Sequence, residues 1–148
     1  MERMDIGKLQ PAMYKAMLFL DKHAGEHNLP QPLVELVKLR ASQINGCVYC
    51  VDAHSTDAKA AGETDVRLHG MSVWQEAPYY TDQERAALAL TESMTRLADA
   101  GDRVPDSVWE LAGKHFDEAD LAALVMVVTV INAWNRIGVT TRMTPANA

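Results

Sequence analysis

Apolar residues recur at the spacing of an α-helix along almost the whole 148-residue chain, whereas the alternating β-branched runs typical of strands are absent. Residues 32–44 are apolar over more than half of the helix circumference, which indicates a largely buried helix. The segment from Leu121 to Val130 is apolar on every side. The chain is therefore expected to be an all-α protein.

Helix caps and breakers divide this pattern into about six to seven helices. Thr81 and Glu84 form a capping-box pair. Asp117 can cap the last helix, and Gly62 is a natural residue just past the end of another. The expected helices cover residues 9–24, 32–44, 47–62, 64–70, 81–97, 105–115 and 117–137. Without repeats, low-complexity tracts or an internal linker, the chain is expected to be one helical-bundle domain, residues 1–148.

The charge balance argues against two classes of partner. The chain contains fourteen Lys and Arg residues and twenty Asp and Glu residues. The resulting net charge of -6 opposes attraction to phosphate backbones and anionic lipid. The longest apolar stretch, residues 121–131, is interrupted by Thr129 and is shorter than the ~20 residues that span a bilayer. No signal peptide is recognisable. We therefore expect no nucleic acid or membrane partner, and a cytoplasmic location.

The only two cysteines, Cys47 and Cys50, form a Cys-x-x-Cys pair at an expected helix start, and His54 follows one helical turn after Cys50. Residues four apart are neighbours on a helix, so the imidazole can take the Cys50 thiol proton. A helix start favours a thiolate, and a three-residue separation suits a disulfide. This pattern is typical of thiol redox chemistry, which requires no cofactor.

Other interpretations of these residues stay open. The cysteines could be buried core residues, since a free cysteine packs as a small apolar side chain. A zinc site that adds His54 and His69 would fit no standard finger pattern, so no metal is expected. Glu35 could orient the imidazole of His54, or it could pair with Lys38 on the same polar stripe.

Several polar and aromatic residues near this pattern have structural interpretations. Tyr49 is expected to point away from the sulfur atoms and pack in the core. Trp74, Tyr79 and Tyr80 are expected to fasten a loop to the core. Asn132, Asn135 and Arg136 are expected to satisfy carbonyls at the end of the last helix.

The stretch ELVKLRASQINGCVYCVDAHS, from Glu35 to Ser55, closely resembles the alkylhydroperoxidase D core of the carboxymuconolactone decarboxylase family. The similarity includes a glutamate twelve residues before the first cysteine, Asn-Gly before the pair, and a histidine four residues after it. Weaker similarity extends through residues 84–95 to residues 131–139. The best-known alkylhydroperoxidases have a histidine where this chain has Tyr49, and the decarboxylase branch does not carry the cysteine pair.

The resemblance implies an all-α fold that assembles into trimers or hexamers and reduces organic hydroperoxides. It implies that Cys50 is the peroxidatic cysteine and Cys47 the resolving cysteine, with His54 and Glu35 as a proton relay. An external dithiol would then reduce the disulfide. The excess of apolar helix faces also predicts a homo-oligomer. Two alternatives remain, namely a disulfide reductase or redox sensor that uses the same pair, and a noncatalytic assembly module.

Overall fold

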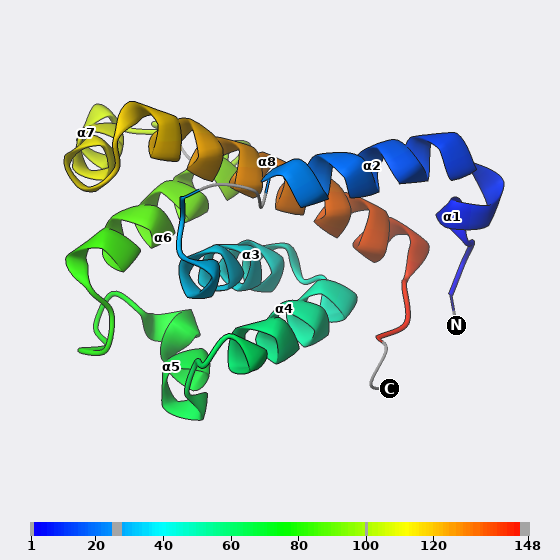
Figure 1. Cartoon of the computed structure of the whole chain (residues 1–148), viewed down its shortest axis with the longest axis horizontal. Coiled ribbons are helices and arrows are strands. Elements are labelled where there is room, and N and C mark those ends of the chain that lie inside the picture. Colours follow the sequence, from blue (N-terminus) through cyan, green and yellow to red (C-terminus); the bar gives the residue numbers. More distant parts are fainter. Residues whose placement is uncertain (1, 25–27, 100, 146–148) are drawn as a thin grey trace.

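The computed structural model describes residues 2–24, 28–99 and 101–145, which contain eight α-helices, one 3-10 turn and no strand (Figure 1). The elements are α1 (Ile6–Leu9), α2 (Pro11–Ala24), α3 (Gln31–Asn45), α4 (Val48–Ala60), α5 (Asp65–Gly70), η1 (Met71–Val73), α6 (Asp82–Thr95), α7 (Asp106–His115) and α8 (Glu118–Thr141). The all-α prediction is confirmed. The expected number of helices was lower because α1 is a single turn that Asp5 caps, and no apolar period marks it.

Helix α3 lies at the centre of the molecule and packs against α4, α6 and α8 (Figure 1). Residues 33–42 are all buried, as the wide apolar face predicts. Three of them are charged, and each has a partner on another element. The Nζ of Lys38 lies 3.1 Å from Asp21 on α2, and Arg40 forms an ion pair of 2.6 Å with Glu92 on α6. The third, Glu35, belongs to the candidate site.

The expected end of the last helix at Ile137 was wrong, because α8 continues through Gly138 to Thr141. Arg142 ends it in the left-handed conformation (φ 57°), and the backbone N–H groups of Arg142 and Met143 both donate to the Gly138 carbonyl. By length and composition α8 could cross a membrane, but half of its apolar window is buried against the rest of the chain. A core helix of a globular domain has the same properties.

Two asparagines of α8 join this helix to the end of α3. Asn45 Nδ2 donates to Asn132 Oδ1 and to Asn135 Oδ1, each over 2.9 Å. Asn135 Nδ2 donates to Ser42 Oγ, also over 2.9 Å. Asn132 and Arg136 also donate to backbone carbonyls, those of Val128 and Asn132. These carbonyls lie inside α8, which continues to Thr141, so the expectation that the three residues satisfy carbonyls at a helix end was wrong. The two asparagine side chains instead hold α8 against the end of α3, which directly precedes the cysteine pair in the chain.

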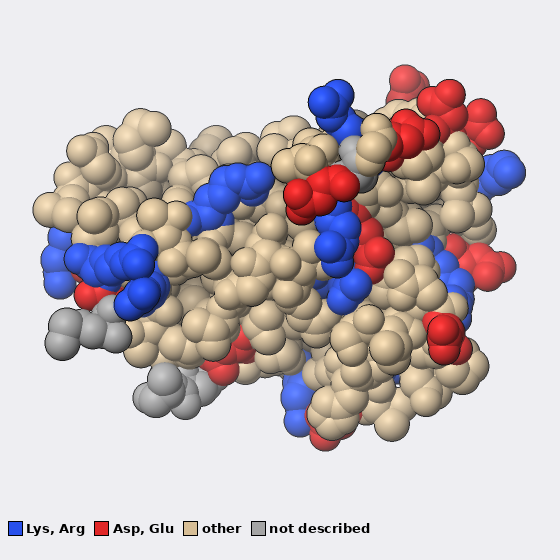
Figure 2. All heavy atoms as spheres, turned by 180° about the vertical axis from the view of Figure 1, so that it is seen from behind, with Lys and Arg blue, Asp and Glu red and all other residues tan. Residues whose placement is uncertain are grey.

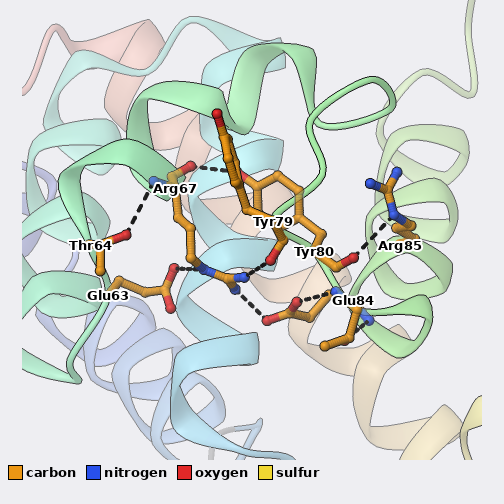
Figure 3. A network of polar contacts seen from close by, with 8 residues as sticks. Glu63, Thr64, Arg67, Tyr79, Tyr80, Glu84 and Arg85 are labelled. Atoms are coloured by element: carbon orange, nitrogen blue, oxygen red, sulfur yellow. Dashed lines mark hydrogen bonds and ion pairs between the residues drawn. The ribbon is translucent and has the colours of Figure 1, made fainter.

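Arg67 of α5 fastens the loop before α6 (Figure 3). Its guanidinium donates to Glu63 over 2.7 Å, to Glu84 at the start of α6, and to the backbone carbonyl of Tyr79. The Tyr80 hydroxyl donates in turn to the Arg67 carbonyl. Burial opposes the positive charge, but the pairs with Glu63 and Glu84 outweigh it and raise the pKa of Arg67. The capping box predicted for Thr81 and Glu84 is present here, so Glu84 serves both contacts.

Trp74, Tyr79 and Tyr80 were all predicted to fasten this loop to the core, and the prediction is confirmed for Trp74 and Tyr80. Trp74 and Tyr80 are buried, and Trp74 Nε1 donates to Glu92 over 2.8 Å. Tyr79 is 45% exposed and contacts the Tyr80 ring edge-on. None of the three lines a wall of the cavity described below.

Charged side chains are scattered over the face of the molecule in Figure 2, where basic and acidic groups lie beside one another in several places with uncharged areas between them. On this face, no continuous basic surface forms that would match a phosphate backbone.

Candidate functional site

The two cysteines lie at the sharp turn between α3 and α4. Gly46 makes this turn with φ 69°, a conformation that other residues rarely adopt. Cys47 follows as the N-cap of α4, and its Sγ accepts the backbone N–H of Cys50 over 3.3 Å. The helix thus begins at Val48, one residue later than expected. Cys47 and Cys50 are joined by a disulfide, with their Cα atoms 5.3 Å apart.

The disulfide is buried between α4 and α8. Cys47 is 1% exposed and Cys50 4% exposed, and they form a small apolar cluster with Ala41 and Ile131. Ala58 of α4 is also fully buried. Small side chains such as those of Ala41 and Ala58 allow neighbouring helices to approach closely.

Glu35 and His54 contact one another directly. His54 Nδ1 lies 2.9 Å from Oε2 of Glu35, which is 3% exposed, and Gln31 Nε2 donates to Oε1 of Glu35 over 2.6 Å. Lys38 pairs with Asp21, so the alternative pairing of Glu35 with Lys38 is not adopted. Because an ionised carboxylate only accepts hydrogen bonds, Nδ1 carries the proton of this contact and Nε2 is the basic nitrogen.

A cavity of about 180 Å³ lies beside the pair of Cys50 and His54. Its other lining residues come from α2, α4, α8 and the segment after α8: Tyr14, Leu18, Asp21, Tyr49, Ala53, Trp134 and Met143. Cys47 is not among the residues that line it. The cavity is therefore lined by Cys50 but not by Cys47, and Cys50 is the cysteine one helical turn before His54.

Tyr49 packs against an apolar cluster, as predicted, but that cluster contains both cysteines, and Tyr49 also lines the cavity, which was not predicted. The helical-wheel argument places it away from the sulfur atoms, but it considers α4 alone. Helix α2 and the residues after α8 extend the cavity around to the Tyr49 side. The Trp134 Nε1 is buried and has no hydrogen-bond partner among the described residues.

Gln31 and Asp57 are site residues that the sequence interpretation missed. One ligating atom each from Glu35, His54 and Asp57 lies within 4.8 Å of the others, a group that could hold a metal ion. It includes neither cysteine nor His69, so it differs from the zinc site considered from the sequence. Gln31 is four residues before Glu35, and Asp57 three after His54, so helical spacing could have found both. No local signal places Tyr14 or Trp134 here.

Comparison with known proteins gives consistent matches. The model of the carboxymuconolactone decarboxylase family matches residues 11–93, which include all four predicted site residues. The uncharacterized protein YdfG of Bacillus subtilis is 35% identical over 138 residues, covering 93% of this chain and 92% of YdfG. The uncharacterized protein YnjA of Escherichia coli is 27% identical, covering 85% of this chain and 68% of YnjA.

Solved structures share the fold. A protein of unknown function from Agrobacterium tumefaciens, described as a candidate antioxidant defence protein AhpD, superposes with a TM-score of 0.93. It is 35% identical, and the match covers 98% of both chains. The debrominase Bmp8 has a TM-score of 0.79 at 18% identity, with 95% of this chain and 74% of Bmp8 covered. At that identity, the similarity shows the fold alone.

Proposed function

This chain belongs to the carboxymuconolactone decarboxylase family, and from that premise we propose that it is a thiol-dependent peroxidase that reduces organic hydroperoxides. One observation carries the proposal. Cys50 and His54 line the same cavity, and the Nδ1 of His54 is held by the carboxylate of Glu35. A thiol, a base and a group that orients the base are the parts that nucleophilic catalysis requires.

The first step consumes the peroxide. His54 takes the proton of the reduced Cys50 thiol, and the thiolate attacks the terminal oxygen of the hydroperoxide. The O–O bond breaks, Cys50 becomes a sulfenic acid, and the proton passes to the departing alkoxide, which leaves as an alcohol. The aromatic and aliphatic side chains of the cavity favour an organic group over hydrogen peroxide.

The second step closes the disulfide. The Cys47 thiol attacks the sulfenic sulfur of Cys50, the S–S bond forms, the S–O bond breaks, and the oxygen leaves as water. An external dithiol then reduces the disulfide, returning two thiols and becoming a disulfide itself. No cofactor takes part in either step.

The test follows the thiols of the reduced protein after addition of cumene hydroperoxide. We expect rapid loss of two thiols per chain, one equivalent of alcohol, and a mass decrease of two hydrogens for one intramolecular disulfide. Hydrogen peroxide at the same concentration should react more slowly. Thiols that react no faster than free cysteine would contradict the proposal and favour an assembly module.

A second measurement on the same reduced protein distinguishes the peroxidase from a disulfide reductase or redox sensor. That function predicts slow reaction with hydroperoxides but rapid exchange with a low-molecular-weight disulfide. A ratio of the two rates that favours the disulfide substrate would replace the peroxidase proposal with this alternative.

We also propose that the chain forms a homo-oligomer, a trimer or a hexamer, because a single chain leaves part of its apolar helix surface exposed. A single chain covers α3 and half of the apolar window of α8. The other half of the α8 window is not covered, and further exposed apolar side chains lie on α2, where Met13 is 66% exposed and Phe19 65% exposed. Light scattering at micromolar concentration should give three or six times the chain mass, and a monomer mass would contradict this proposal.

A further inference from the structure

Helix α8 presents bare backbone to the disulfide at Gly138. A Cβ built on Gly138 would lie 2.7 Å from Cys47 Sγ and 3.5 Å from Cys50 Sγ. The first distance is far inside van der Waals contact, whereas the second is an ordinary contact. Gly138 is inside α8, and glycine disfavours a helix relative to alanine. Its backbone is helical, so the requirement for glycine here is space for one sulfur atom.

We propose that Gly138 is a positioning residue that allows Cys47 to close and keep the disulfide with Cys50. The proposal deepens the peroxidase function proposed above, because the disulfide is its second step. Gly138 does not contact the peroxide in this scheme. It acts through the position of the Cys47 sulfur, which is held between the N-terminus of α4 and the backbone of α8.

The contact distances divide the two chemical steps. A methyl group at position 138 would leave Cys50 in ordinary contact, so attack of its thiolate on a peroxide would be little affected. The same methyl group would occupy the space that Cys47 Sγ takes in the disulfide. Condensation of the Cys47 thiol with the Cys50 sulfenic acid, which releases water, would therefore slow.

The disulfide and the dithiol also differ in freedom. In the disulfide, the S–S bond fixes the Cys47 sulfur against Gly138. In the dithiol, the Cys47 side chain can rotate about its Cα–Cβ bond to another staggered position. A methyl group on residue 138 therefore disfavours the disulfide more than the dithiol, because overpacking costs most where the neighbour cannot move.

Gly113 provides a matched control for a glycine-to-alanine change inside a helix. It lies in α7, and a Cβ built there would meet no atom within 4 Å. The Gly138→Ala and Gly113→Ala variants should be equilibrated with mixtures of reduced and oxidised dithiothreitol, and the disulfide fraction measured after acid quenching. This measurement uses no peroxide, so it is independent of whether the chain is a peroxidase.

We expect Gly138→Ala to shift the ratio of disulfide to dithiol at least about tenfold toward the dithiol, with Gly113→Ala unchanged. Addition of cumene hydroperoxide to reduced Gly138→Ala should then accumulate a sulfenic acid that dimedone traps, with the first step within about threefold of the parent protein. An unchanged disulfide ratio in Gly138→Ala would overturn the proposal.

A double-mutant cycle covers the case in which Gly138→Ala does not fold. Replacing Cys47 by Ala removes the sulfur that the new methyl group would meet, so Cys47→Ala combined with Gly138→Ala should fold and resist urea as Cys47→Ala alone does. If the double variant is as unstable as Gly138→Ala, the glycine serves general packing of α8, and the proposal fails.

Discussion

Glu35 and His54 are nineteen residues apart in the chain, yet Oε2 of Glu35 lies 2.9 Å from Nδ1 of His54. The two residues lie on different helices, α3 and α4, which pack side by side (Figure 1). Gln31 holds the second oxygen of the carboxylate. The orientation of the imidazole therefore depends on the packing of α3 against α4, and the relay can be tested one residue at a time.

Replacement of His54 by Ala is expected to slow the reaction of reduced Cys50 with cumene hydroperoxide by about 100-fold, since general base catalysis typically contributes 10²–10⁴-fold. The rate should then rise with pH toward the pKa of an unassisted thiol, about 8.5. Stopped-flow measurement between pH 6 and 9 checks both. A His54→Ala rate equal to that of the parent protein at every pH would rule out the relay.

Replacement of Glu35 by Gln keeps the size of the side chain but removes its charge. We expect a milder defect of about tenfold in the same reaction, because the imidazole keeps a hydrogen-bond partner but loses the carboxylate that orients it. Gln31→Ala, which leaves the Glu35 carboxylate in place, is the comparison. A larger loss in Gln31→Ala than in Glu35→Gln would show that position outweighs charge.

The two cysteines should behave differently, because Cys50 lines the cavity and Cys47 does not. Cys50→Ser is expected to abolish consumption of the hydroperoxide even in a single turnover. Cys47→Ser should complete one turnover and leave a sulfenic acid that dimedone traps, with no disulfide formed. Mass spectrometry distinguishes these products. If Cys47→Ser loses the first turnover and Cys50→Ser keeps it, the two roles are reversed.

Features that depend on neighbours along one helix could be predicted from the sequence. The all-α fold, the cap at Asp117 and the capping box at Thr81 follow from spacing, and the structure has all of them. The end of α8 could not be predicted, because Gly138 is a typical helix terminator. Glycine at position 138 leaves space for the Cys47 sulfur at the N-terminus of α4. A rule that considers only the residues of one helix cannot predict a contact with another helix.

The same distinction applies within the site. The cysteine pair and His54 follow from the spacing on one helix, whereas the partner of Glu35 stayed open because two candidates, Lys38 and His54, were both reachable. Asp21 on α2 decides the matter by pairing with Lys38. Tyr14 comes to the cavity only because α2 packs against α8, a contact between distant segments that no short motif encodes.

Alkaline pH should destabilise the protein through Tyr80. Burial raises the pKa of this phenol above its usual value of 10, despite the nearby charge of Arg67. The unfolded chain therefore releases the Tyr80 proton at a lower pH than the folded chain. This contribution to stability is complete below about pH 10 and is lost as the pH rises through the folded-state pKa.

Urea unfolding of Tyr80→Phe at pH 8 and at pH 11 tests this linkage. The variant should lose about 1 kcal/mol at pH 8, because the hydroxyl no longer donates to the Arg67 carbonyl (Figure 3). Its stability should fall less between the two pH values than that of the parent protein. Tyr14, whose pKa burial also raises, accounts for part of the remaining decrease. Tyr79→Phe, at an exposed tyrosine, is the control. If the free energy of unfolding falls equally between pH 8 and pH 11 in Tyr80→Phe and Tyr79→Phe, the effect does not come from Tyr80.

Asn135 should contribute strongly to stability, because its side chain is fully buried and joins α8 to the end of α3. Asn135→Ala removes one of the two acceptors of Asn45 Nδ2 and the donor to Ser42 Oγ, and it leaves a small void. We expect a loss of about 2 to 3 kcal/mol in the free energy of unfolding. Asn28→Ala, at an exposed asparagine, should change it by less than about 0.5 kcal/mol.

The Asn135→Ala variant should also affect the cysteine pair, since Asn45 directly precedes the turn at Gly46 that carries Cys47. Loosening this end of α3 allows the N-terminus of α4 to move, so the reduced variant should form its disulfide more slowly than the parent protein after addition of cumene hydroperoxide. Thiol loss followed by acid quenching measures the rate. A normal rate of disulfide formation in a destabilised Asn135→Ala would restrict the asparagine network to stability and separate it from the chemistry of the site.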